Sequence, residues 1–306
     1  MTVFIGSWLW AIFTVAASVA QTFRNAMQRE LTATLGTVGA THVRFLFGLP
    51  FALMFLFVVL RVTGQPFPHV SSRAFAWTLV AGLTQIGATA LMLAAMRERS
   101  FVVTIAYTKT EPVQIALFGL IFLGDRLSPG LIAAILIATA GVMIMSWPKR
   151  PAAGSEGIEA YSWRPALIGI AAGALFGLAA VCFRGGIREL SHPNFVVAAT
   201  TTLAIGLTIQ TVLLTTYLLI LDRAILKAIF RAWRPSIVAG FMGAFASQLW
   251  FLAFAIESAA RVRTLALIEI LFAQMLSRNL FKQSLNSREG FGVALIIVGV
   301  VLLLNL

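Results

Sequence analysis

The feature that most constrains this chain is a series of long apolar runs, separated by short polar or Pro-rich breaks. A helix that crosses the hydrocarbon core of a bilayer needs roughly 20 predominantly apolar residues. Runs such as Leu131 to Met145 are apolar on every side, whereas the strands of a transmembrane barrel alternate between apolar and polar residues. Only 11% of the residues are charged, against roughly a quarter in soluble domains. The sequence therefore predicts an all-α polytopic membrane protein and excludes a soluble enzyme.

The breaks divide the apolar material into ten predicted transmembrane helices. These helices span residues 4–23, 43–60, 75–96, 101–123, 130–147, 164–183, 195–220, 236–256, 263–281 and 289–305. The connection 148–163 differs from the others because it begins with Pro148-Lys149-Arg150-Pro151 and carries Gly, Ser and Glu near the middle of the chain. We interpret it as a linker between a first repeat, 1–147, and a second repeat, 164–306.

An internal repeat supports this division. An offset of 158 residues aligns the later part of the second half with that of the first, and the matching positions include Glu111 with Glu269 and Gly141 with Gly299. Earlier in each half, Phe23-Arg24 followed by Arg29-Glu30-Leu31-Thr32 matches Phe183-Arg184 followed by Arg188-Glu189-Leu190-Ser191, with one deleted residue. Five spans is an odd number, so the second repeat enters the membrane upside down relative to the first. Secondary transporters built from such inverted repeats bind their substrates near the bilayer midplane, between the repeats.

The excess of basic residues has a simple source in a membrane protein. The formal charge is +12, and in a soluble chain it would suggest a nucleic-acid partner. Here the basic residues gather in connections, where they influence orientation. The odd-numbered connections carry 14 Lys and Arg and the even-numbered ones carry 7, which favours termini outside the cell. Four of these arginines belong to the repeated motif, so the orientation stays open.

Catalytic, metal and redox chemistry find no support in the sequence. Cys182 is the single cysteine, and His42, His69 and His192 are predicted to lie in or next to connections. No metal-ligand or nucleophile–base spacing results. We therefore expect no enzyme activity, no cofactor, no metal and no nucleic-acid partner.

Two glutamates lie within predicted spans, where an ionisable side chain costs a few kcal/mol and usually faces a cavity or a partner. Glu111 and Glu269 are too far from the span ends to reach the headgroups. They are interpreted as pseudosymmetric carboxylates that contact substrate or carry a coupling proton. The alternative is a structural ion pair with Arg44, Arg261 or Lys109.

Pro112 follows Glu111 and cannot donate a hydrogen bond to the carbonyl of Thr108. Tyr107 and Thr108 share a helix face with Glu111, so these three residues and the freed carbonyl predict a polar patch on a kinked helix. Lys109 points away from Glu111 and is expected to meet a neighbouring helix. A tolerated kink in a packing helix is the alternative.

Further candidate substrate-binding residues are polar or basic. Gln21 and Arg24 would line a vestibule at the end of the first span, although Arg24 could also extend to the interface. Its repeat partner Arg184 shares this ambiguity, and Arg44 is predicted to be an interfacial anchor or a cavity wall. Gln248 and the neighbouring Trp250 complete the set. Three glycines at four-residue spacing predict a close helix contact, namely Gly169, Gly173 and Gly177.

The run Thr110-Glu111-Pro112-Val113, followed by Phe122-Leu123-Gly124-Asp125-Arg126-Leu127-Ser128 and a glycine-punctuated span, resembles the fourth and fifth helices of EamA-type proteins. These proteins belong to the drug/metabolite transporter superfamily. Arg44 also falls where that family tends to place an arginine. The resemblance covers essentially the whole chain as two EamA repeats. It implies ten helices, a central cavity between the halves and secondary transport of small metabolites, often as export.

These observations lead to one expected function. We expect a multi-pass protein of the bacterial inner membrane that transports a small polar metabolite by alternating access. A cavity with both signs of charge favours an amino-acid-like, zwitterionic or anionic substrate, with protons as a coupling partner. A flippase for a lipid-linked or amphiphilic phosphate compound is the alternative.

Overall fold

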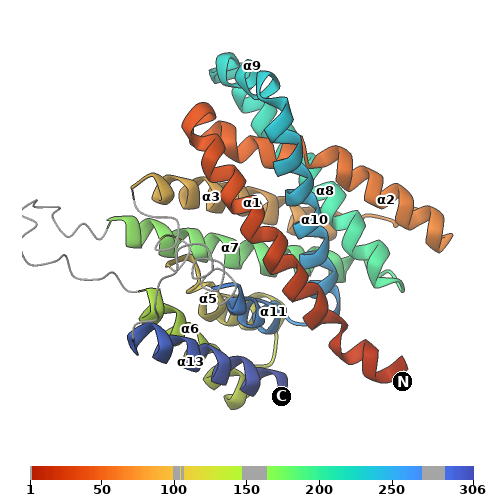
Figure 1. Ribbon diagram of the computed structural model, residues 1–306. Coiled ribbons are helices and arrows are strands. Elements are labelled where there is room, and N and C mark those ends of the chain that lie inside the picture. The colour runs from red at the N-terminus through yellow and green to blue at the C-terminus, as the bar shows by residue number, and fades with distance from the viewer. Residues whose placement is uncertain (1, 99–103, 105–106, 147–163, 271–286) are drawn as a thin grey trace, which may run out of the picture.

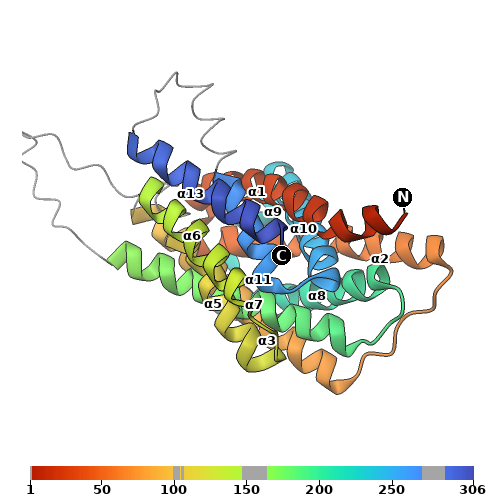
Figure 2. The ribbon, with the colours of Figure 1, turned by 90° about the horizontal axis from the view of Figure 1, so that it is seen from below.

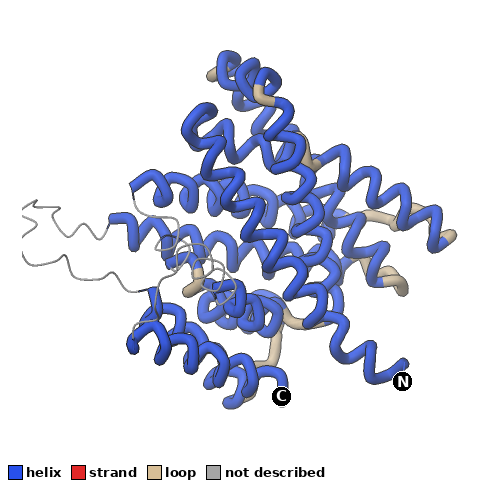
Figure 3. Tube along the Cα trace, in the orientation of Figure 1, coloured by secondary structure: helices blue, strands red, loops and turns tan. Residues whose placement is uncertain are grey.

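Because a lipid environment offers no hydrogen-bond partners to the backbone, a membrane-spanning segment has to satisfy its own N–H and C=O groups. The computed structural model describes residues 2–98, 104, 107–146, 164–270 and 287–306. All regular structure in these residues is helical, and Figure 3 shows no strand among them. The predicted all-α class is therefore confirmed, while the predicted linker 148–163 lies outside the described residues.

The first half begins with a helical stretch of 45 residues. Its elements are α1 (Thr2–Leu46), α2 (Leu49–Thr63), α3 (Ser72–Glu98), α5 (Glu111–Phe118), the π-helical turn η1 (Gly119–Leu123) and α6 (Pro129–Ser146). Within α1, Gly36 has a φ of 67° and a ψ of 179°, a conformation that residues with a Cβ atom rarely adopt. Two helices therefore meet at Gly36, and the chain turns there.

The second half contains three helices that begin at polar caps. Its elements are α7 (Arg164–Glu189), α8 (Phe195–Leu221), α9 (Arg223–Arg231), α10 (Trp233–Ile256), α11 (Ala259–Leu265), the 3-10 turn η2 (Ala266–Ile268) and α13 (Ser287–Leu304). The side chains of Asn194, Asp222 and Ser258 accept hydrogen bonds from backbone N–H groups in the first turns of α8, α9 and α11. These caps satisfy donors that have no partner within the helix.

Five helical stretches in the described residues are long and apolar enough to cross a membrane. They are Trp8–Thr63, Ser72–Met96, Ala166–Glu189, Phe195–Leu221 and Trp233–Ile256. Shorter apolar helices occupy Glu111–Leu123, Pro129–Met145 and Gly290–Leu304. This distribution agrees with a polytopic membrane protein.

The helices pack in a pattern that relates the two halves. The most extensive contacts join α1 with α10, α3 with α7, and α6 with α13. In Figures 1 and 2, α6 and α13 run side by side, and α1 lies against α10. The first helix of each half thus packs on the third predicted span of the other half, while the two fifth spans pair with each other. A pair of inverted repeats produces this pattern.

Two predicted boundaries differ from the observed helices in a way that affects the site. The predicted span 4–23 continues as helix to Gly36, because the charged residues after Phe23 extend the helix rather than end it. Arg24 therefore lies within a helix and is only 2% exposed, so it does not extend to the interface. The predicted connection between spans seven and eight contains a further helix, α9, which the sequence analysis did not anticipate.

The contact between α6 and α13 depends on glycine and gives a direct test. A Cβ atom added at Gly141 would lie 2.7 Å from the Gly292 carbonyl oxygen and 2.8 Å from the Ile296 nitrogen. At Gly290 of α13, nothing lies within 4 Å of the added atom. Gly141→Ala is therefore expected to destabilise the protein by about 1–3 kcal/mol, whereas Gly290→Ala should gain up to about 1 kcal/mol. Thermal unfolding in detergent measures both, and equal effects would contradict this packing.

Candidate functional site

Six charged side chains are buried where the two halves meet. Arg24 and Arg44 lie in α1. Glu111 is the first residue of α5, and Lys109 precedes it by two residues. Arg263 lies in α11, and Glu269 directly follows η2. Four of them are cations and two are carboxylates. Burial of so many charges in a membrane protein is costly unless they have a function or are paired.

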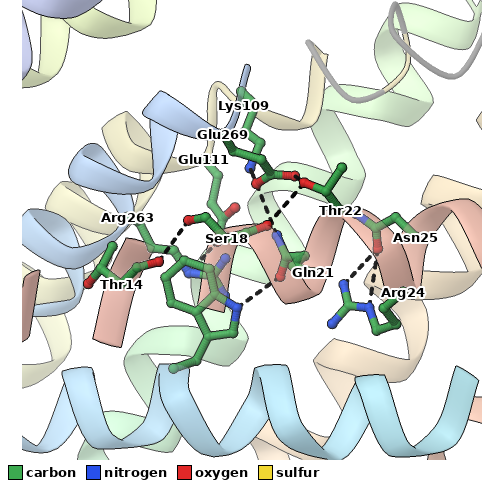
Figure 4. Close-up of polar contacts among 11 residues, drawn as sticks. Thr14, Ser18, Gln21, Thr22, Arg24, Asn25, Lys109, Glu111, Arg263 and Glu269 are labelled. Atoms are coloured by element: carbon green, nitrogen blue, oxygen red, sulfur yellow. Dashed lines mark hydrogen bonds and ion pairs between the residues drawn. The ribbon is translucent and has the colours of Figure 1, made fainter. Parts of the chain in front are cut away.

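The two carboxylates form ion pairs that cross between the halves. The Lys109 Nζ atom lies 2.5 Å from Oε2 of Glu269, and Nε of Arg263 lies 3.4 Å from Oε1 of Glu111. Each carboxylate therefore meets a cation from the opposite repeat. We call Lys109–Glu269 and Arg263–Glu111 the crossed ion pairs, and Figure 4 shows them beside α1.

Polar side chains of α1 complete the surroundings of Glu269. Oγ1 of Thr22 donates to Oε1 of Glu269 at 3.2 Å, and Nε2 of Gln21 donates to Oε2 at 3.5 Å. The indole nitrogen of Trp250 donates to the Gln21 amide oxygen at 3.0 Å. Glu269 is thus held by contacts from two segments of the chain, α1 and the turn before α5, while Trp250 holds Gln21 in place (Figure 4).

Arg263 is held mainly by aromatic rings. Its guanidinium carbon lies 4.1 Å from the ring centroid of Trp250 and 5.5 Å from that of Phe254. Stacking of this kind is favourable for a desolvated cation. In the part of the chain that the structure describes, its Nε atom has no hydrogen-bond partner, and the same is true of Oε1 of Glu111. The Arg263–Glu111 pair is therefore the looser of the crossed ion pairs.

Arg24 and Arg44 have a different environment, because neither lies within ion-pair distance of a carboxylate in the described part of the chain. Nη2 and Nε of Arg24 donate to Oδ1 of Asn25 at 2.7 Å and 3.2 Å. Arg44 donates to the hydroxyls of Thr89 at 3.2 Å and Ser247 at 3.4 Å. Each arginine is 2% exposed, so two guanidinium charges are buried with neutral partners.

Two small enclosed cavities lie among these side chains. The first is lined by three arginines together with neutral polar groups, namely Arg24, Arg44, Arg263, Gln21, Gln85 and Ser247. The second shares Gln21, Arg24 and Arg263 with the first and extends to Asn25, Thr108, Lys109 and Glu111. Each is about 20 Å³, enough room for about one water molecule. The site is therefore closed around its charged groups.

The helix before Glu111 is interrupted at its proline, as the sequence suggested. Residues Tyr107 and Thr108 are helical, Lys109 and Thr110 form a turn, and α5 starts at Glu111. The Thr108 carbonyl that Pro112 leaves without its helical donor lies against α7, where a Cβ atom on Gly173 would come within 2.8 Å of it. The predicted glycine stripe of α7 therefore packs on this broken helix.

Most of the predicted site residues come together. The cavities or crossed ion pairs include seven of the predicted substrate-binding residues, namely Gln21, Arg24, Arg44, Thr108, Glu111, Trp250 and Glu269. Glu111 and Glu269, the predicted proton carriers, are also the two carboxylates of the ion pairs. The sequence left Lys109, Arg44 and Arg261 open as ion-pair partners of the two glutamates. Of these three, Lys109 does pair with one of them, Glu269.

Three predicted residues lie elsewhere. Arg184 makes two hydrogen bonds to the Asp125 carboxylate, at 2.7 Å and 2.9 Å, and a third to the Glu257 carbonyl at 3.0 Å. Gln248 donates to Thr200 and joins α10 to α8. Tyr107 packs against Gly169 of α7. None of these three residues lines either cavity, because each side chain is directed to a contact between helices or connections.

Arg263 is the main site residue that the sequence analysis missed. It stands at the first position of the predicted span 263–281 and was counted as a charge of the preceding connection. Arg261, two residues earlier, does lie near that connection and pairs with Glu257. Residues two apart point to opposite sides of a helix, and this spacing was the available signal. His42 was also misplaced, because it is fully buried in α1 and contacts Thr215 at 3.0 Å.

Comparisons with known proteins agree on the fold. Residues 3–147 and 163–305 each match the profile of the EamA-like transporter family. The chain is similar to a solved structure described as "Crystal structure of protein", with a TM-score of 0.62 and 16% identity over 94% of this chain and 95% of that chain. This likeness concerns the fold alone. No curated protein matches the chain.

The crossed ion pairs predict strong energetic coupling. Glu269→Gln leaves the buried Lys109 without its counter-ion and should destabilise the protein by about 3–5 kcal/mol. Adding Lys109→Gln should recover a large part of this loss, because the uncompensated charge is removed. A double-mutant cycle by thermal unfolding in detergent measures the coupling.

The control for this cycle is the partly exposed pair of Arg261 with Glu257. Because solvent screens it, Glu257→Gln should cost about 1 kcal/mol or less. Independent, additive effects of Lys109→Gln and Glu269→Gln would show that the contact contributes nothing.

Proposed function

The chain belongs to the EamA-like transporter family, and from this premise we propose that it is a secondary active transporter that exports a small polar metabolite by alternating access. Family membership makes it a multi-pass integral membrane protein and a transporter rather than an enzyme. We place it in a bacterial inner membrane. Its partners are the bilayer, a small-molecule substrate and protons.

The observation that carries this proposal is the location of the crossed ion pairs. Both pairs join residues of different repeats, and both border the closed cavities. Alternating access in inverted-repeat transporters requires the repeats to move against each other around a fixed site. Ion pairs between the repeats stabilise one closed arrangement, and their separation would accompany opening. Buried charges that served stability alone would be a poor choice, because well-packed apolar residues stabilise as well or better.

Glu111 is the better candidate for the coupling proton. Glu269 accepts from Thr22 and Gln21 and lies 2.5 Å from Lys109. Glu111 has its nearest cation at 3.4 Å, and its Oε1 atom accepts no hydrogen bond from the described residues. Protonation of Glu111 would release Arg263 from its only ion-pair partner in the described residues. Proton binding and movement of the repeats would thereby be linked.

One further observation supports the alternative, a flippase for an amphiphilic phosphate compound. An apolar groove of about 420 Å³ lies along α3, η1 and α7, with Trp77 and Phe122 in its wall. These two residues also line an adjoining hollow of about 320 Å³ that contains Arg188 and Glu189. An acyl chain and its headgroup would fit these two environments. Protein-dependent exposure of a fluorescent phospholipid to dithionite in vesicles would favour this alternative.

The transport proposal is tested with purified protein in proteoliposomes loaded with labelled dicarboxylates, phosphate monoesters, amino acids or amines. We expect efflux of at least one class, faster when the outside is acidic. Glu111→Gln should slow it by about tenfold or more, equivalent to about 1.4 kcal/mol, and should remove its dependence on the pH gradient.

Glu257→Gln is the matched control, since Glu257 is also ion-paired but lies away from the cavities. It should transport at the unchanged rate. The proposal would be overturned if no solute class left the proteoliposomes faster than it leaves liposomes without protein. Normal proton-driven efflux in the Glu111→Gln variant would remove Glu111 from the mechanism.

A further inference from the structure

We infer that Arg24 and Arg44 together bind the acidic part of the transported molecule, and that this substrate is a small dianion, a dicarboxylate or a phosphate monoester. The inference rests on the proposed transport function and narrows its substrate class. It goes against an amino-acid zwitterion and against a cation. Both kinds of molecule present negatively charged oxygen atoms and carry a total charge of minus two.

The charges of the site do not cancel without a ligand. Lys109 with Glu269, and Arg263 with Glu111, account for both carboxylates. Arg24 and Arg44 remain, each 2% exposed and each hydrogen-bonded, among the described residues, only to neutral side chains. An uncompensated charge in a low-dielectric interior costs several kcal/mol. The site therefore favours a ligand that supplies two negative charges.

The two arginines converge on one cavity. A Cβ atom added at Gly243 of α10 would lie 3.1 Å from Cγ of Arg44 and 3.6 Å from Cδ of Arg24. Both side chains thus pass the same glycine, and both line the first cavity. The absence of a side chain at Gly243 leaves room for the two stems to lie close together. Two like charges held side by side without a carboxylate form an arrangement that an anion would stabilise.

Donors without committed acceptors surround this cavity. Nε of Arg44 is buried and has no hydrogen-bond partner among the described residues. The two Nη atoms of Arg44 donate only to hydroxyls, at 3.2 Å and 3.4 Å, distances long enough for a better acceptor to compete. Ser247 and Gln85 line the same cavity and offer neutral donors. A planar guanidinium matches the paired oxygens of a carboxylate or phosphate.

An ammonium group finds no comparable partner. It would need a carboxylate, and Glu269 already contacts Lys109, Thr22 and Gln21. Glu111 faces Arg263, a cation that also lines both cavities. An approaching amine would therefore meet positive charge first. The electrostatics select against amines and against the amino group of a zwitterion.

Arg263 gives substrate binding a consequence for the repeats. It lines the cavity of Arg24 and Arg44 while it pairs with Glu111 at 3.4 Å. An anion in that cavity would compete with Glu111 for this guanidinium. Binding would therefore weaken one of the crossed ion pairs between the halves. Because the cavity has room for only about one water molecule, such loosening would also provide the space that the substrate needs.

The test uses purified protein and thermal unfolding at constant ionic strength, since a bound ligand raises the unfolding temperature. The probes are succinate, glycerol 3-phosphate, alanine and putrescine, with sodium chloride as the salt control. We expect stabilisation by succinate, by glycerol 3-phosphate or by both, and none by alanine or putrescine. The dianion that raises the unfolding temperature at the lower concentration is the one that fits the site better, and this comparison distinguishes a carboxylate site from a phosphate site.

Arginine variants separate binding from structure. Arg24→Gln and Arg44→Gln should weaken dianion binding by about tenfold or more, and without ligand they should unfold at the same or a higher temperature, because a buried unpaired charge is removed. A merely structural arginine would instead lower the unfolding temperature. Arg61→Gln, at an exposed arginine of α2, is the matched control and should bind normally. Arg44→Lys keeps the charge but loses the planar fork, and should bind with intermediate strength.

The outcomes distinguish this inference from the proposed function. Stabilisation and efflux of alanine or putrescine, with no response to either dianion, would overturn the dianion inference and leave the transport function intact. Dianion binding that persists in both Gln variants would remove the two arginines from the site. If a Gln variant does not fold, the arginine is structural and the inference fails at that residue. The Arg44→Lys variant then shows whether the fold needs the charge or the planar shape of the side chain. Efflux of no solute class would overturn the transport function itself.

Discussion

The arrangement of the site depends on ion pairs that are made between the two halves and not within either one. Lys109 with Glu269, and Arg263 with Glu111, bring the fourth predicted span of one repeat against the fourth of the other, which is the ninth of the chain. In an apolar medium a buried charge without a partner is strongly unfavourable. The closed state is therefore specified by electrostatics as well as by packing, and both carboxylates are occupied within it.

Packing of small residues makes this electrostatic arrangement possible. The glycine stripe of α7 lets the broken helix before α5 approach closely, which sets the position of Lys109 and Glu111. Gly243 of α10 leaves space for Arg24 and Arg44. Small residues are common at helix contacts in membranes, because packing replaces the hydrophobic effect there. The same glycines thus serve close helix contact and the placement of long charged side chains.

The sequence predicted much of the candidate site because membranes penalise charge. Glu111 and Glu269 stand within predicted apolar spans, and this contrast identified them as candidates, whereas Arg24 and Arg44 stand near predicted span ends, where an interfacial role stayed open. The same reasoning failed at Arg263, which lies at a span end where a basic residue is also typical of a connection. It failed in the other direction at Arg184, a basic residue repeated at the position of Arg24 but paired with Asp125. Repeat symmetry in the sequence does not fix which partners a side chain finds.

Hydropathy and residue spacing were enough to predict the class of the protein, its apolar helices, its repeat and the two glutamates within the spans. These properties follow from local hydrophobicity and spacing, which need no knowledge of partners. The tertiary structure decided which cation meets which carboxylate, that α1 continues as helix past Arg24, and that two arginines share a cavity without a counter-ion. Pairing of this kind depends on contacts between residues about 150 positions or more apart, such as Lys109 with Glu269, and only the packing of the two repeats brings them together.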